Sequence, residues 1–229
     1  MLTCSMLSAR ILERFLNDRR AAARIACPPT LIPAPGQYLL AHNLASDDPL
    51  AVPVFLAGDS PEGFLAAPPL PRTWYPGMTL SLRGPLGRGF TLPASARRVA
   101  LAAIDVSPAY LLALIQPALA LGAAVALVCD SPPDDLPADV EIHSLAAFGE
   151  VSRWADYLAL AAPRASLPEL RARLGRGNPP KFPTVAQVLI VAPMPCGSLA
   201  DCGVCSVDGR GGVRLACKDG PVFDLTDLP

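Results

Sequence analysis

The chain has 229 residues and a formal net charge of −1, a length that suits one large domain or two small ones. Hydrophobic residues make up 52% and charged residues 17%, a composition that excludes an intrinsically disordered chain. Because basic residues are not in excess, we expect no nucleic-acid partner. The 27 prolines and 17 glycines predict many turns and short strands.

The first part of the chain, residues 1–94, contains short apolar segments separated by proline and glycine. Residues 34–40, 52–56 and 78–82 have this character, and residues 79–83 alternate between polar and apolar side chains. Alternation with a period of two indicates strands with one buried face. The sequence therefore predicts a small antiparallel β-barrel or sandwich over residues 1–94.

The first 27 residues give two conflicting signals. Ile11, Leu12, Phe15 and Leu16 recur at helical spacing, so periodicity alone predicts a helix there. Residues 24–27 are instead typical of a strand. Charged residues are scattered through this region and leave no apolar core of the secretory kind, so we expect a cytoplasmic protein.

Residues 95–192 change to continuous apolar segments that alternate with helical ones, which predicts an α/β domain with a parallel sheet. The expected strands are residues 99–104, 123–129, 140–142 and 186–191. The expected helices are residues 108–121, 144–160 and 167–174.

One stretch of this domain, residues 106–129, has no charged side chain and is long enough to span a bilayer. Pro108, Pro117 and Gly122 interrupt it and divide it into a helix and a strand. We therefore expect a buried β-α-β unit, and no membrane insertion.

Four of the seven cysteines lie close together near the C-terminus, with the spacing C-x5-C-x2-C-x11-C. Four thiolates can hold a tetrahedral zinc ion or a [2Fe–2S] cluster. Zinc ribbons generally use two C-x2-C pairs, whereas plant-type [2Fe–2S] sites use three close cysteines and a distant fourth. The spacing favours a [2Fe–2S] cluster, with zinc or four incidental cysteines as alternatives. The predicted ligands are Cys196, Cys202, Cys205 and Cys217.

Two glycines lie beside these ligands, Gly197 and Gly203. Without a side chain, each allows backbone N–H groups to turn toward cluster sulfurs. The isolated Cys4, Cys27 and Cys129 are expected to be small buried hydrophobic residues instead.

The cysteine loop at residues 196–205 and the stretch C-K-D-G-P-V-F at residues 217–223 carry a resemblance. Together they resemble the electron-transfer subunits of dihydroorotate dehydrogenase, which are ferredoxin-reductase-like flavoproteins. P-G-Q-Y at residues 35–38 is similar to a barrel strand of that family, and residues 76–80 and 84–90 are similar to the end of its flavin domain.

The resemblance implies three parts: a barrel of the FAD-binding kind over residues 1–94, an α/β domain of the nicotinamide-binding kind over residues 95–192, and a [2Fe–2S] segment over residues 193–229. It implies flavin contacts at Gly84, Gly87 and Gly89. It also implies that residues 9–14 and 20–27 are barrel strands.

The same resemblance implies a partner and a pathway. In that family the cluster relays electrons to FMN in a separate catalytic subunit of pyrimidine biosynthesis. We therefore expect a hetero-oligomer with a dihydroorotate dehydrogenase-like FMN subunit or another flavoprotein.

The sequence departs from the family at its nucleotide motifs. Residues 52–55 are V-P-V-F where the family has an R-P-x-S type flavin motif, so the arginine and the hydroxyl are missing. Residues 66–73 are rich in proline, which lacks the N–H group that binds phosphate. The turn at residues 102–107 has no glycine, and Asp105 stands where a pyrophosphate would lie. The first two cysteines are separated by five residues, one more than in the family.

These departures predict weak or no NADH binding and leave FAD as an open possibility. His42 and His143 are the only histidines, and no triad or P-loop pattern is present. The sequence thus predicts an iron-sulfur electron-transfer subunit. The alternatives are a non-catalytic docking or regulatory protein that keeps the cluster, and a zinc-stabilised structural domain.

Overall fold

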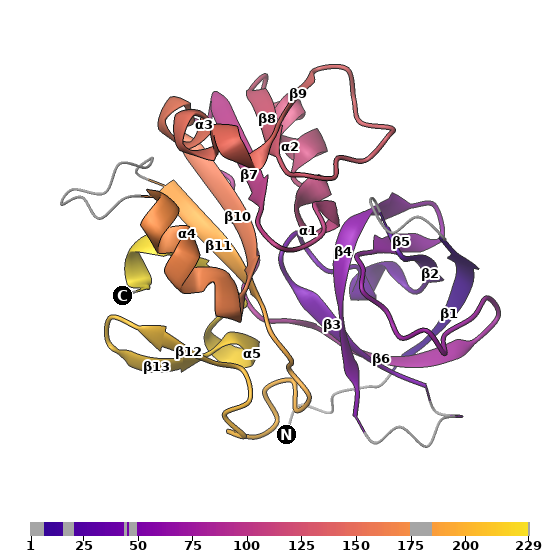
Figure 1. The fold of residues 1–229 in the computed structure, drawn as a ribbon. Helices are drawn as coiled ribbons and strands as arrows, with labels where there is room; N and C mark the ends of the chain where they lie inside the picture. Colours follow the sequence, from indigo (N-terminus) through magenta and orange to yellow (C-terminus); the bar gives the residue numbers. More distant parts are fainter. Residues whose placement is uncertain (1–6, 16–20, 44, 46–49, 175–184, 229) are drawn as a thin grey trace.

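The computed structural model describes residues 7–15, 21–43, 45, 50–174 and 185–228. The chain forms an N-terminal barrel and an α/β domain that pack side by side, and the last segment of the chain lies along the α/β domain next to the junction (Figure 1).

The barrel is closed and antiparallel, with strand order β1-β2-β5-β4-β3-β6. Its strands are β1 (Leu7–Arg14), β2 (Ala23–Ala26), β3 (Tyr38–His42), β4 (Val52–Ser60), β5 (Gly63–Ala66) and β6 (Thr79–Leu86), with the short 3-10 helix η1 (Pro29–Leu31) between β2 and β3. The predicted antiparallel barrel is confirmed.

The helix that periodicity predicts near Ile11 is wrong, because this segment is strand β1. β1 pairs with β2 on one side and with β6 on the other, which closes the barrel. Ala9 and Ile11 alternate inward, with exposed fractions of 4% and 0%. The strands at β1 and β2 that the family resemblance implies are confirmed.

The α/β domain contains a six-stranded sheet in the order β14-β11-β10-β7-β8-β9. Five strands are parallel, and β14 is antiparallel to β11, so the predicted parallel sheet is in fact mixed. Its strands are β7 (Arg98–Ala103), β8 (Ala124–Val128), β9 (Val140–His143), β10 (Tyr157–Pro163), β11 (Val185–Val191) and β14 (Val222–Asp224).

Two helix predictions need correction. The single helix expected over residues 108–121 is two short helices, α1 (Ala109–Leu112) and α2 (Ile115–Ala120). The helix expected over residues 144–160 consists of the 3-10 helix η2 (Leu145–Ala147) and α3 (Phe148–Trp154), after which the chain enters β10. β10 lies between β7 and β11, and burial on both faces favours its continuous apolar sequence.

The remaining prediction, a helix over residues 167–174, is confirmed as α4 (Leu167–Leu174), which follows the 3-10 helix η3 (Arg164–Ser166). The uncharged stretch 106–129 forms α1, α2 and β8, as the β-α-β interpretation expects. Within the described residues, every helix is too short or too polar to cross a membrane.

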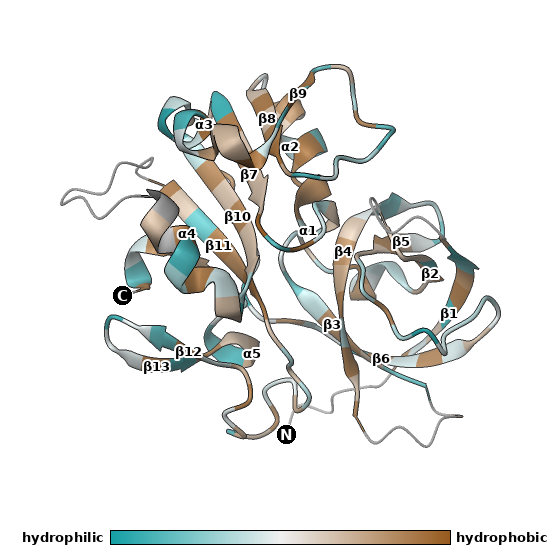
Figure 2. Ribbon diagram, in the orientation of Figure 1, coloured by the Kyte–Doolittle hydropathy of each residue, from teal (hydrophilic) through white to brown (hydrophobic). Residues whose placement is uncertain are grey.

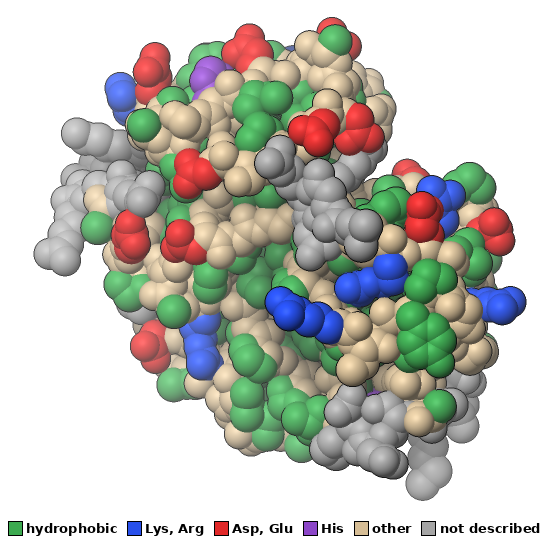
Figure 3. All heavy atoms as spheres, turned by 45° about the vertical axis from the view of Figure 1, so that its right-hand side comes forward, with side chains coloured by type: hydrophobic (Ala, Val, Ile, Leu, Met, Phe, Trp, Pro, Cys, Tyr) green, Lys and Arg blue, Asp and Glu red, His purple; other side chains and the backbone are tan. Residues whose placement is uncertain are grey.

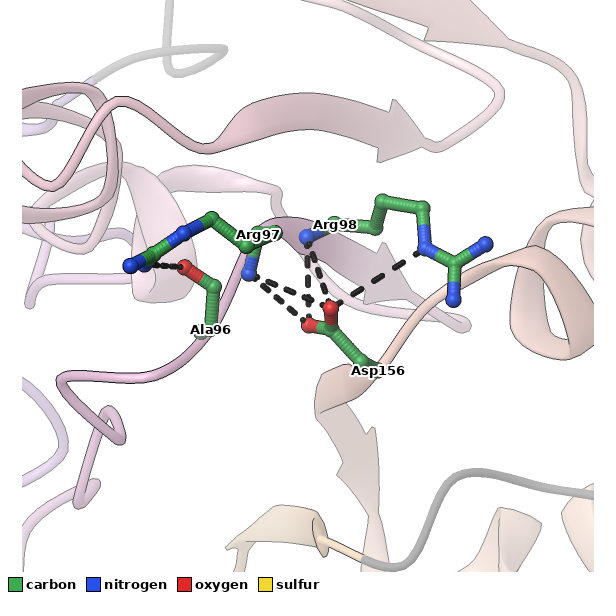
Figure 4. A network of polar contacts seen from close by, with 4 residues as sticks. All are labelled: Ala96, Arg97, Arg98 and Asp156. Atoms are coloured by element: carbon green, nitrogen blue, oxygen red, sulfur yellow. Dashed lines mark hydrogen bonds and ion pairs between the residues drawn. The ribbon is translucent and has the colours of Figure 1, made fainter.

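One acidic side chain ties two neighbouring strands together at their N-terminal ends. The Asp156 carboxylate accepts hydrogen bonds from the backbone N–H groups of Arg97 and Arg98 at 3.1–3.2 Å (Figure 4). It also lies 3.9 Å from Nε of Arg98. Because Asp156 precedes β10 and both arginines lie at the start of β7, these contacts help to fix the strand that the sequence analysis missed.

One hydrophobic core extends across both domains, and the interior of the barrel forms a second. The sheet strands are strongly hydrophobic (Figure 2), and their buried side chains form one cluster with Tyr38, Leu40 and Phe55 of the barrel. The Phe55 ring packs edge-on against Tyr110 of α1, with ring centroids 5.3 Å apart. The junction is therefore closed by aromatic side chains.

A buried amide connects three strands of the α/β domain with the linker that precedes it. Gln187 of β11 is 7% exposed, and its Oε1 accepts hydrogen bonds from the Tyr157 hydroxyl at 3.0 Å and the Thr91 backbone N–H at 2.9 Å. Its Nε2 donates to Asp224 of β14 at 3.2 Å. The interdomain linker, β10, β11 and β14 thus meet at one side chain.

Gln187→Leu is expected to destabilise the protein, because it leaves the Tyr157 hydroxyl and the Thr91 N–H without their acceptor. For the buried Tyr157 hydroxyl, the lost acceptor costs about 1–3 kcal/mol. Thermal unfolding followed by circular dichroism tests this, with Gln116→Leu at an exposed position of α2 as the control. Equal melting temperatures for the two variants would contradict the prediction.

Candidate metal centre

The cysteine segment follows β11 and lies where the barrel meets the sheet (Figure 1). Carboxyl ends of parallel strands are the usual location of functional residues in α/β sheets. After the loop at residues 195–205 the chain forms the hairpin β12 (Ser206–Gly209) and β13 (Gly212–Leu215). It continues into α5 (Ala216–Asp219), then β14, and ends in the 3-10 helix η4 (Leu225–Asp227).

The four predicted ligands come together as two pairs. The sulfur atoms of Cys196 and Cys202 lie 3.5 Å apart. The backbone N–H of Cys217 donates to the sulfur of Cys205 at 3.4 Å. The Cys217 thiol also interacts with the thiols of Cys205 and Cys196, which connects the two pairs.

The pairs differ in exposure. Cys205 and Cys217 are each 1% exposed, whereas Cys196 is half-buried and Cys202 is exposed. One pair therefore lies in the core shared with the barrel, and the other reaches the surface.

Cys196 and Cys217, one from each pair, also differ in the acidity of their thiols. Burial opposes ionisation of Cys196, but hydrogen bonds with the backbone at Ala200, with the Cys202 thiol and with the backbone at Ser198 outweigh it and lower its pKa to about 7. Burial, and after it the contact with Cys205, raise the pKa of Cys217 to about 12. A metal cation would lower the pKa of a coordinating thiol and ionise it outright.

The loop between the first two cysteines bends through left-handed backbone. Gly197 has φ +49° and Ser198 has φ +70°. A Cβ atom at Gly197 would overlap the Leu40 side chain and the Arg83 guanidinium of the barrel. Gly197 is therefore required where the loop meets the barrel. Gly203, with φ +73°, has open space around it and supplies only the turn.

Side chains from the barrel bind the backbone of the cysteine segment. The buried Tyr38 hydroxyl donates to the carbonyl oxygen of Cys217 at 3.1 Å. Nη2 of Arg83 donates to the carbonyl of Cys196 at 3.2 Å and to that of Gly197. Burial raises the pKa of Tyr38, so its hydroxyl keeps the proton that it donates.

The α/β domain holds the same segment from its other side. Nη1 of Arg164, in η3, donates to the carbonyl oxygens of Val204 at 2.7 Å and Ser206 at 3.0 Å. These two residues flank Cys205. Sequence spacing contains no signal for Arg164, Arg83 or the Tyr38 hydroxyl, because their contacts join residues far apart in the chain.

The arrangement of the four thiols determines which metal group they can hold. Within the described residues, no group of three or more His, Cys, Asp or Glu side chains already surrounds the position of one metal ion. A zinc ion needs four donors around one point. A two-iron cluster instead takes two ligands on each iron, and the pairing of Cys196 with Cys202 and of Cys205 with Cys217 fits that donor set.

The glycines expected to contact flavin face other parts of the chain. A Cβ atom at Gly87 would lie 2.6 Å from the Gly220 carbonyl oxygen, and one at Gly89 would lie 2.7 Å from that of Pro35. Gly84 approaches the Leu39 side chain of β3. These glycines permit close packing of the barrel, and their contact with a flavin stays a prediction.

The residues at the expected flavin motif do not fit the ring. Phe55 stands where the family has a hydroxyl, is 4% exposed, and packs between Tyr110 and Tyr38, whose ring centroid is 5.9 Å away. The space beside the motif is therefore filled by side chains.

The expected nicotinamide turn is also unsuited to a dinucleotide. Asp105 follows β7 with φ +55° and accepts a hydrogen bond from the Ser166 hydroxyl at 2.7 Å. A pocket of about 440 Å³ beside it is also lined by Asp130. Two carboxylates at this edge would repel a pyrophosphate.

The other cysteines and histidines lie elsewhere. Cys129 is buried at the end of β8 and Cys27 is half-buried after β2, as expected for small hydrophobic residues. Burial raises the pKa of both thiols. Cys4 lies outside the described residues. His143 lies 3.5 Å from the Glu141 carboxylate on the edge strand β9.

Comparison with known proteins gives a likeness in structure. No protein-family model matches the sequence, and no curated protein sequence matches it. The chain is similar to the NADH-dependent reduced ferredoxin-NADP oxidoreductase studied for flavin-based electron bifurcation. That likeness has a TM-score of 0.72 at 18% identity and covers 100% of this chain and 91% of the other.

Two further solved structures are similar over about three quarters of the chain. The ferredoxin reductase of carbazole 1,9a-dioxygenase has a TM-score of 0.58 at 16% identity, covering 74% of this chain and 64% of that one. The siderophore-interacting protein from Acinetobacter baumannii has a TM-score of 0.51 at 18% identity, covering 73% and 82%. The chain therefore has the fold of the ferredoxin-NADP reductase-like flavoproteins.

Proposed function

We propose that this chain is an electron-transfer module that carries a [2Fe–2S] cluster on Cys196, Cys202, Cys205 and Cys217. The observation that carries the proposal is the convergence of these side chains in two pairs beside the barrel. When bound, such a cluster supplies transfer of one electron at a time. The fold shared with ferredoxin reductases supports a redox role.

The residues around the exposed pair give the module an outward face. Cys202 is exposed, and Leu199 and Val204 on the same loop are 74% and 43% exposed. Apolar side chains such as these suit the centre of a protein interface. This face would bring the surface pair close to a redox partner.

The partner is proposed to be a flavoprotein. The C-K-D-G-P-V-F stretch at residues 217–223 favours the FMN subunit of a dihydroorotate dehydrogenase-like enzyme, in a hetero-oligomer of pyrimidine biosynthesis. Figure 3 shows most Lys and Arg side chains of that view over the barrel and most Asp and Glu side chains over the α/β domain. A partner with opposite charges over its two halves would be oriented by this arrangement.

A second candidate function is a non-catalytic protein that keeps the cluster in order to dock to or regulate a dehydrogenase. The packing of Phe55 between Tyr38 and Tyr110 favours it, because the Phe55 ring fills the place where the family's flavin motif has a hydroxyl group. The two candidates differ in whether electrons pass through the chain. A zinc-stabilised domain is the third reading, and metal analysis distinguishes it.

Replacement of any one of Cys196, Cys202, Cys205 or Cys217 by Ser is expected to abolish the visible absorption of the anaerobically purified protein and to remove most of its iron. Loss of a ligand leaves one iron incompletely coordinated. Iron, sulfide and zinc assays on the same samples make the measurement. Cys27→Ser and Cys129→Ser are the matched controls, and full iron content in two of the four ligand variants would contradict the assignment.

The isolated protein is expected to contain little or no flavin and to react slowly with NADH. The causes are the carboxylates of Asp105 and Asp130 beside the same pocket, and the Phe55 ring that stands where the family's flavin motif has a hydroxyl group. Anaerobic mixing with NADH in a stopped-flow spectrometer measures the reaction, with dithionite as the positive control. Rapid bleaching of the cluster by NADH would overturn this prediction.

Leu199→Glu is expected to weaken the complex with the flavoprotein partner, because it adds a charge to the apolar face. The measurement is the FMN content and identity of proteins that co-purify from the native cell. Ile142→Glu, on the edge strand farthest from β14, is the control. Recovery of the wild-type chain without any flavoprotein would favour the regulatory or structural candidate.

A further inference from the structure

The barrel holds the cysteine segment with two side chains on adjacent strands. β3 pairs with β6, and Leu40 is the partner of Arg83 in the register. Tyr38, two residues before Leu40, donates to the Cys217 carbonyl at 3.1 Å, and Arg83 donates to the carbonyls of Cys196 and Gly197. The two strands thus bind the backbone at the first and the last of the four cysteines.

This contact is closely packed. Gly197 is buried, and any side chain there would overlap Leu40 and Arg83. The backbone of the cysteine loop at Gly197 therefore lies directly against two side chains of the barrel. A change in the position of Arg83 would be passed directly to Cys196.

Arg83 also brings a positive charge to the site. Its side chain is partly buried, and among the described residues no carboxylate forms an ion pair with it. Four thiolates would give the loop a strong negative charge that grows when an electron is added. A nearby cation stabilises the more negative state, so it raises the reduction potential of the centre.

We propose that Arg83 and Tyr38 are positioning residues for the metal centre, and that the charge of Arg83 raises its reduction potential. This inference rests on the proposed function. It assigns to the barrel a further role: two of its strands hold and tune the centre.

The test compares Arg83→Gln, Arg83→Lys and Tyr38→Phe by anaerobic redox titration and by EPR of the reduced protein. At the potential where half of the wild-type centres are reduced, the ratio of reduced to oxidised centres is expected to fall about tenfold in Arg83→Gln. Arg83→Lys keeps the charge and is expected to restore most of the ratio. Tyr38→Phe keeps the ring and the charge, so it is expected to change the EPR spectrum more than the ratio.

Arg24→Gln is the matched control, because it removes a barrel arginine that instead lies 3.4 Å from the Glu13 carboxylate. Equal ratios for Arg83→Gln and Arg24→Gln would overturn the role of the charge. If Arg83→Gln does not fold, Arg83→Lys and Tyr38→Phe are compared with wild type instead. Unchanged EPR spectra in both variants would overturn the role of these contacts in positioning the centre.

A second measurement does not need the metal. In the metal-free protein, labelling of Cys196 by a thiol reagent is expected to be several-fold faster in Arg83→Gln than in Arg24→Gln, because the loop loses its contact with the barrel. Equal labelling rates would overturn the positioning role. If the wild-type protein contains no iron, the proposed function is refuted. The labelling rates would then still decide whether Arg83 positions the loop.

Discussion

The pairing of β14 with β11 determines where the last cysteine lies. Val222 and Phe223 pair with Leu189 and Val188, and the Ile190 N–H donates to the Pro221 carbonyl at 2.9 Å. Just before this strand, the Gly220 carbonyl accepts a hydrogen bond from the backbone N–H of Arg88, which follows β6, at 2.6 Å. The chain is thus attached to both domains within a few residues of Cys217. Because the cysteine loop leaves the same strand β11, the two parts of the ligand set have to meet.

Aromatic side chains join the two domains beside β4. Phe55 packs against Tyr110 of the α/β domain and against Tyr38 of its own barrel, and these rings belong to one core with the sheet. Close-packed interiors have few alternative arrangements. A junction of this kind keeps the barrel and the cysteine segment at fixed positions relative to each other. This rigidity would suit the proposed centre, because electron transfer is favoured when the surrounding atoms do not have to rearrange.

The sequence determines most of the fold but little of the site's surroundings. Strands β3 and β4 are predictable from their short apolar segments, of which the first follows Pro35 and Gly36 and the second contains Pro53. Strand β10 is not, since its apolar residues directly follow α3 and extend the apparent helix. The four cysteines are predictable from spacing alone. Tyr38 and Arg83 are not, because their position beside the cysteines depends on the register of β3 with β6 and on the packing of two domains.

The unequal burial of the two cysteine pairs follows from these attachments. Cys205 and Cys217 lie in the core, between the Arg164 contact on one side and the Tyr38 contact on the other. Cys202 lies exposed on the loop, where its sulfur contacts that of Cys196. In the proposed electron-transfer module, the buried pair would therefore fix the location of the centre, and the exposed pair would face the partner. A second redox group would have to approach from the side of Cys202, because both domains cover the opposite side.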